Sequence, residues 1–174
     1  MIPFDEYSDR VEKHIRQKYG VRVVTRDVPD PLTGDLNGAE IQIDYAVTPE
    51  QRLFLLAHPF GHTVQWNVTP GAYEVGRPRR PPVQVSMLPA LMGYEKEAAR
   101  YALGLLHEVG LTELDQWLAD SAACDAEYLR HFYSTGEKRD FLSFWKDGTR
   151  MIAPKEIPPF VPAERVWRSD GIVI

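Results

Sequence analysis

One short segment in the first third of the chain constrains the fold more than any other feature of the sequence. Thr48 is followed by Pro49, and Gln51 stands three residues after the threonine. In a capping box, such a threonine and glutamine satisfy free N–H groups at the start of a helix, and proline is favoured at the first helical position. The segment therefore predicts a helix over residues 49–66. Its buried face is expected to carry Leu53, Leu56, Ala57, Phe60 and Val64.

The other apolar patterns predict a mostly helical α+β chain with a small N-terminal β-sheet. Helical spacing of apolar residues indicates helices over residues 4–19, 89–109 and 112–135, with a shorter segment at 141–145. Strands are expected over residues 21–25 and 39–45, where residues are β-branched or alternate between apolar and polar, and a short strand at 83–86 within a long loop.

The length and composition fit one main domain with an appendage. The 174 residues are 44% hydrophobic and 26% charged, as in ordinary globular proteins. We expect residues 1–135 to form the domain. Residues 136–174 are expected to be a helical and extended appendage packed on it, with strand or docking segments at 166–167 and 172–174.

Charge and cysteine content exclude several classes of protein. The net charge of -5 disfavours a nucleic-acid partner, because nucleic-acid binders usually present a basic face. A single cysteine, Cys124, excludes an internal disulfide and a cysteine-rich metal site. The N-terminus has no signal-peptide pattern, and no stretch approaches the ~18–20 apolar residues that span a bilayer. A cytoplasmic protein without a membrane partner is the expectation.

Two histidines on the helix expected at residues 49–66 are the strongest candidates for chemistry. His58 and His62 are four residues apart, so both rings can point to one side of the helix. The HExxH zinc motif uses this spacing, with a glutamate after the first histidine that activates a metal-bound water. A histidine pair of this spacing is also common by chance. The pair alone therefore leaves open whether the two histidines bind a metal ion or serve a structural role.

The surrounding residues favour a metal site. The run Leu56-Ala57-His58-Pro59-Phe60-Gly61-His62 resembles the LAHELGH-type helix of the ImmA/IrrE (DUF955) family of zinc-metallopeptidase-like proteins. Further along, Glu95-Lys96-Glu97-Ala98-Ala99-Arg100-Tyr101-Ala102 is similar to the second motif of the same family, which has the pattern ExEAnxFA. The resemblance covers residues 21–109.

This resemblance implies a zincin-like fold in which one zinc ion is held by His58, His62 and Glu95, with Glu97 as the alternative third ligand. Three protein ligands leave one coordination position for water, as in catalytic zinc sites. The resemblance also implies a protein partner, such as a repressor or an antitoxin encoded beside it.

Two positions depart from the family pattern. Pro59 replaces the glutamate that acts as general base, and proline cannot transfer a proton, so no catalytic residue is expected. Ala99 stands where the family carries Asn or Asp, which would orient a ligand. The first hypothesis is thus a degenerate metallopeptidase-like domain that has lost proteolysis and serves as a binding or regulatory module.

Two other functions stay open at this point. In the second hypothesis, the protein is an active zinc peptidase in which Glu97 or Glu74 substitutes as base. In the third, it is a metal-free structural or interaction protein, and His58 and His62 are merely buried or hydrogen-bonded.

Overall fold

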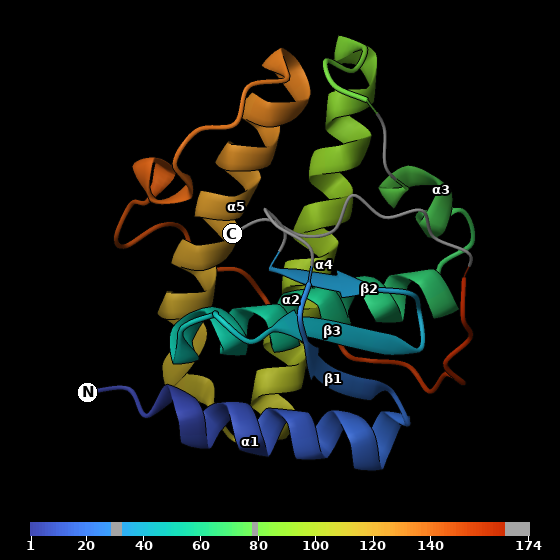
Figure 1. Ribbon diagram of the computed structural model, residues 1–174, viewed down its shortest axis with the longest axis vertical. Coiled ribbons are helices and arrows are strands. Elements are labelled where there is room, and N and C mark those ends of the chain that lie inside the picture. Colours follow the sequence, from blue (N-terminus) through green and yellow to red (C-terminus); the bar gives the residue numbers. More distant parts are fainter. Residues whose placement is uncertain (29–32, 78–79, 166–174) are drawn as a thin grey trace.

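The computed structural model describes residues 1–28, 33–77 and 80–165, and confirms a mostly helical α+β chain with a small sheet (Figure 1). The α-helices and strands are, in chain order, α1 (Phe4–His14), β1 (Arg22–Arg26), β2 (Gly34–Leu36), β3 (Glu40–Asp44), α2 (Pro49–Val68), α3 (Ala72–Gly76), α4 (Leu88–Glu108) and α5 (Asp115–Thr135). A π-helix, Ile15–Tyr19, extends α1, and 3-10 helices cover Val85–Met87, Thr112–Leu114 and Phe141–Phe144. In the part of the chain that the structure describes, no helix combines the length and apolar character required to cross a bilayer.

The sheet has the strand order β1-β3-β2, with β1 parallel and β2 antiparallel to β3. Ile41 and Ile43 in the central strand are fully buried, while Glu40, Gln42 and Asp44 are partly exposed. This alternation is the two-residue period of a strand with one face on the core. β2 was not predicted, because Gly34 and its polar neighbours carry turn chemistry rather than a strand pattern.

Helix α2 is the centre of the molecule. Thr48 Oγ1 accepts a hydrogen bond from the Gln51 N–H, and Gln51 Oε1 accepts one from the Thr48 N–H, which confirms the capping box. The helix continues through Pro59, and all residues from Leu53 to Trp66 are buried. A helix buried on every side has neighbours around its whole circumference.

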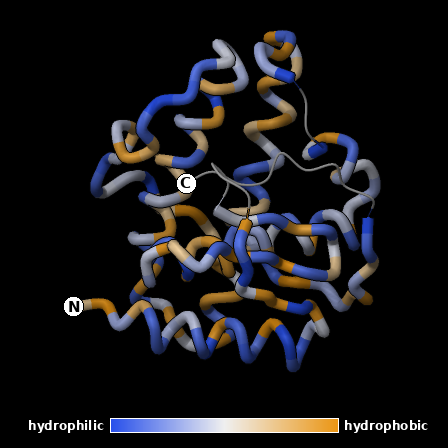
Figure 2. The backbone as a smooth tube through the Cα atoms, in the orientation of Figure 1, coloured by the Kyte–Doolittle hydropathy of each residue, from blue (hydrophilic) through white to orange (hydrophobic). Residues whose placement is uncertain are grey.

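The neighbours of α2 include α1, the sheet and α4, and α4 packs in turn against α5 (Figure 1). Along α1, hydrophilic and hydrophobic residues alternate (Figure 2), and Val11 on this helix is fully buried, as expected for a helix with one face on the core. Against α4 the approach is closest at Gly61, where a Cβ atom would overlap the backbone of Ala98. The backbones of α2 and α4 are therefore in direct contact.

The segment after α5 returns along the surface to the core. Asp120 on α5 accepts hydrogen bonds from the backbone N–H groups of Gly148 and Thr149. Further on, Ile157 joins the main hydrophobic cluster, and the Ala163 N–H donates to the side chain of Asn67. The described part of the appendage is thus packed on the rest of the chain.

The strand expected at residues 83–86 is wrong, because the structure has the 3-10 helix Val85–Met87 there. The strand or docking segments expected at 166–167 and 172–174 lie outside the described residues.

Candidate metal centre

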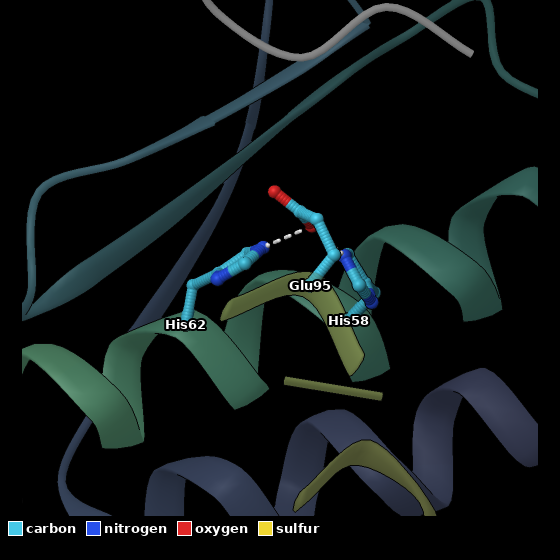
Figure 3. Close-up of side chains that lie close together, drawn as sticks. All are labelled: His58, His62 and Glu95. Carbon is cyan, nitrogen blue, oxygen red and sulfur yellow. Dashed lines mark hydrogen bonds and ion pairs between the residues drawn. The ribbon is translucent and has the colours of Figure 1, made fainter. Parts of the chain in front are cut away.

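The structure brings together the three side chains that the sequence singled out. His58 and His62 point from α2 to Glu95, which lies on α4 (Figure 3). The Oε2 atom of Glu95 lies 3.1 Å from His58 Nε2 and 3.0 Å from His62 Nε2. One potential ligand atom from each residue lies within 4.8 Å of the others. All three residues are at least 90% buried, with 5%, 7% and 7% of their surface exposed.

Aromatic rings hold both imidazoles in place. The His58 ring stacks on Phe54 with 5.2 Å between centroids, and the His62 ring stacks on Tyr94 with 4.4 Å. The two imidazoles are nearly perpendicular, at 86°. Because each ring has an aromatic neighbour on one face, both Nε2 atoms keep their orientation towards Glu95.

Gln65 fixes the proton on His62. Its Nε2 donates to the backbone carbonyl of Tyr94 and to the Glu97 carboxylate, so its Oε1 faces His62. That oxygen lies 2.9 Å from His62 Nδ1, which must therefore carry the hydrogen. The His62 Nε2 atom can then offer its lone pair to a metal ion. Metal-binding histidines usually have such a partner on the other ring nitrogen.

Asp125 is a fourth buried group at the same place, and the sequence analysis did not identify it. It lies on α5, its side chain is 8% exposed, and its Oδ2 is 3.5 Å from His58 Nε2. The sequence does indicate that Asp125 is buried, because position 125 falls in the apolar stripe of the helix, seven residues after Leu118 and seven before Phe132. A carboxylate in such a stripe is buried and needs a partner.

The buried charges shift the pKa values of these groups. Burial lowers the pKa of His58, but its hydrogen bond to Glu95 and the charges of Asp125 and Glu95 outweigh burial, and the net shift is upward. Burial raises the pKa of Glu95, but the charges and hydrogen bonds of the two histidines bring it well below its usual range. The pKa of Asp125 is raised by burial, which His58 opposes and Glu95 reinforces. Opposite charges thus compensate one another within the cluster.

The other carboxylates that the sequence suggested lie elsewhere. Glu97 accepts hydrogen bonds from Lys155 and Gln65 and is not part of the three-residue cluster. Glu74 lies on α3 with 63% of its side chain exposed, paired with Arg77. Pro59 and Ala99 are buried and offer no ionisable group.

The donor set could hold a metal ion. Two imidazole nitrogens and one carboxylate oxygen are ligands that zinc commonly takes in proteins. His62 has the hydrogen-bond partner expected of a ligand, whereas His58 Nδ1 is buried without one within the described residues. The His58 ring is therefore oriented by its stacking on Phe54 and by the contacts of Nε2, without a hydrogen bond at Nδ1.

Comparisons with protein-family models, with curated proteins and with solved structures give no match to this chain.

Proposed function

We propose that this protein is a zincin-like zinc-binding domain, similar to the ImmA/IrrE family, that has lost proteolysis and acts as a binding or regulatory module. The observation that carries this proposal is the convergence of His58, His62 and Glu95 in a buried cluster. Helices α2 and α4 supply these groups in the order that the two sequence motifs imply.

The residues of the site would hold a zinc ion through His58 Nε2, His62 Nε2 and a Glu95 oxygen. Bound zinc would supply a Lewis acid and a positive charge that both histidines and the carboxylate share. Gln65 keeps the His62 proton on Nδ1, away from the metal side. The close contact between Gly61 and Ala98 keeps α4, and with it Glu95, at its distance from α2.

The absence of proteolysis follows from Pro59. This residue lies one position after His58, and its side chain has no group that can take a proton. The two carboxylates considered as substitutes are held by Lys155 and Gln65 or exposed on α3. A protein partner, such as a repressor or an antitoxin, follows from the family resemblance, and binding to the product of an adjacent gene would test it.

Zinc content tests the central proposal. We expect about one zinc per chain in the wild-type protein, and much less in His58→Ala and His62→Ala, with a lower Tm because bound metal stabilises the folded state. His131→Ala, a histidine on α5 outside the cluster, is the matched control and should keep its zinc. Equal zinc content in the wild type and both cluster variants would remove this site from consideration. No zinc in the purified wild-type protein would support a metal-free structural protein. Chelator-sensitive proteolysis that His58→Ala abolishes would establish an active peptidase.

A further inference from the structure

A series of polar contacts leads from the C-terminal segment to His62. Lys155 Nζ, in the segment after α5, lies 2.7 Å from Glu97 Oε2 on α4. The other oxygen of this carboxylate, Oε1, accepts a hydrogen bond of 3.1 Å from Gln65 Nε2 on α2. Gln65 Oε1 in turn lies 2.9 Å from His62 Nδ1. Three hydrogen bonds in series therefore connect a partly exposed lysine with a candidate metal ligand.

The Gln65 amide has a partner for each of its polar groups. A primary amide has two N–H groups and one carbonyl oxygen. The Nε2 group of Gln65 donates to the Tyr94 carbonyl at 2.9 Å and to Glu97, and Oε1 faces His62. If the amide turned by 180°, its oxygen would face the Tyr94 carbonyl and the Glu97 carboxylate, which are both acceptors. Glu97 therefore helps to keep Oε1 beside the His62 N–H.

Lys155 keeps Glu97 in place. Its backbone N–H donates to the Arg100 carbonyl at 2.9 Å, and its Nζ lies 4.7 Å from the centroid of the Tyr101 ring. The side chains of Lys155 and Glu97 are 34% and 31% exposed, so their ion pair contributes little to stability. Its effect is on position, because it holds Oε2 and leaves Oε1 to accept from Gln65.

We propose that Glu97 and Lys155 are positioning residues of the candidate metal centre, through which the C-terminal segment holds His62 in the orientation that binds metal. This inference rests on the zinc binding proposed above. Glu97, the alternative third ligand that the family resemblance suggested, would thus serve the site through Gln65 and not by contact with the ion. A partner that draws residue 155 away from α4 would lower zinc affinity, because the two events are coupled.

Two measurements test this proposal: zinc affinity by chelator competition, and the exchange of the His62 Nδ1 proton with water by NMR of the metal-free protein. Glu97→Leu and Lys155→Met should lower zinc affinity and speed this exchange by roughly 3–10-fold each, the factor that one ordinary hydrogen bond supplies. Glu97→Gln keeps an oxygen that can accept from Gln65 and should recover most of the loss. Lys96→Met removes an exposed lysine beside Glu97 and should behave as the wild type.

An internal reference separates positioning from a general loss of stability. The Trp66 indole N–H, also on α2, donates to the Tyr94 hydroxyl, and its exchange should not change. Faster exchange of both protons would indicate a merely structural role and refute the proposal, as would a Glu97→Gln variant no better than Glu97→Leu.

The outcomes also separate this inference from the proposed function. Wild-type protein that binds no zinc would refute the proposed function and with it the role of both residues at a metal centre. Zinc binding by the wild type, with the same affinity and the same proton exchange in Glu97→Leu and Lys155→Met, would refute this inference alone.

Discussion

Helices α2 and α4 touch at Gly61, and a side chain added there should weaken both the fold and the candidate metal centre. In Gly61→Ala, the new Cβ would overlap the carbonyl oxygen, carbonyl carbon and Cα of Ala98, all of which are backbone atoms. A rotamer change cannot relieve this overlap, so α4 must move by about 1 Å, and such overpacking typically costs ~1–3 kcal/mol. Better helix propensity of alanine returns about 1 kcal/mol. We expect a net loss of about 0–2 kcal/mol in the free energy of unfolding.

The same displacement should weaken the candidate metal centre. Glu95 lies one turn before Ala98 on α4, and ligand distances in zinc sites hold to within about 0.2 Å. A shift of about 1 Å should therefore lower zinc affinity by at least about 10-fold. Urea unfolding and competition with a chromophoric chelator measure the two effects.

A glycine on α4 provides the control for this experiment. Gly93 is exposed and a Cβ there would meet nothing within 4 Å, so Gly93→Ala should stabilise the helix by roughly 0.5–1 kcal/mol. Zinc affinity should not change. If Gly61→Ala is as stable as the wild type and binds zinc equally well, the contact with Ala98 does not set the position of α4.

Four further predictions concern zinc affinity, peptide cleavage, thiol reactivity and stability at acid pH. Gln65→Leu should remove the hydrogen bond that orients His62 and lower zinc affinity by roughly 10–100-fold, measured by chelator competition. Pro59→Glu should give at most weak, zinc-dependent cleavage of peptide substrates, because it restores a base while Ala99 still offers no side chain that could orient Glu95; strong cleavage would contradict this view. Cys124 should react very slowly with thiol reagents at pH 8, because burial, followed by the charge of a neighbouring aspartate, raises its pKa to about 12. Burial raises the pKa of Glu108, but hydrogen bonds from a histidine, a lysine and a tyrosine outweigh burial and lower it. The stabilising effect of Glu108 is therefore present above the usual carboxyl pKa and is lost as pH falls through the lowered value. The acid limb of an unfolding curve should therefore flatten in Glu108→Gln.

The parts of the structure that the sequence predicted are those with local, periodic causes. The cap at Thr48 and the spacing of His58 and His62 depend on residues a few positions apart, and a helix fixes their geometry. Glu95 was preferred over Glu97 by the family resemblance, and helix α4 places Glu95 in the cluster while Glu97 faces Lys155.

The parts that were missed depend on contacts between distant segments. Asp125 lies near His58 because α5 packs on α4. The residues around position 125 indicate that it is buried, but they do not indicate which side chain lies beside it. The role of Gln65 depends on the backbone of Tyr94, which comes from another helix and accepts a hydrogen bond from the Gln65 side chain. β2 exists because β3 offers hydrogen-bond partners to a segment with poor strand propensity.

The return of the C-terminal segment to the core bears on where the folding unit ends. Lys155 donates its N–H to the Arg100 carbonyl, and its own carbonyl lies where any side chain at position 104 would stand, against Gly104. Two residues later, Ile157 fills part of the main core. A chain that ends after α5 would therefore leave part of the apolar core beside α4 uncovered. It would also lose the segment that packs closely against Gly104. Residues beyond 135 thus contribute to the same core as the helices that carry the cluster, and we expect a chain that ends at residue 135 to be less stable than the full chain.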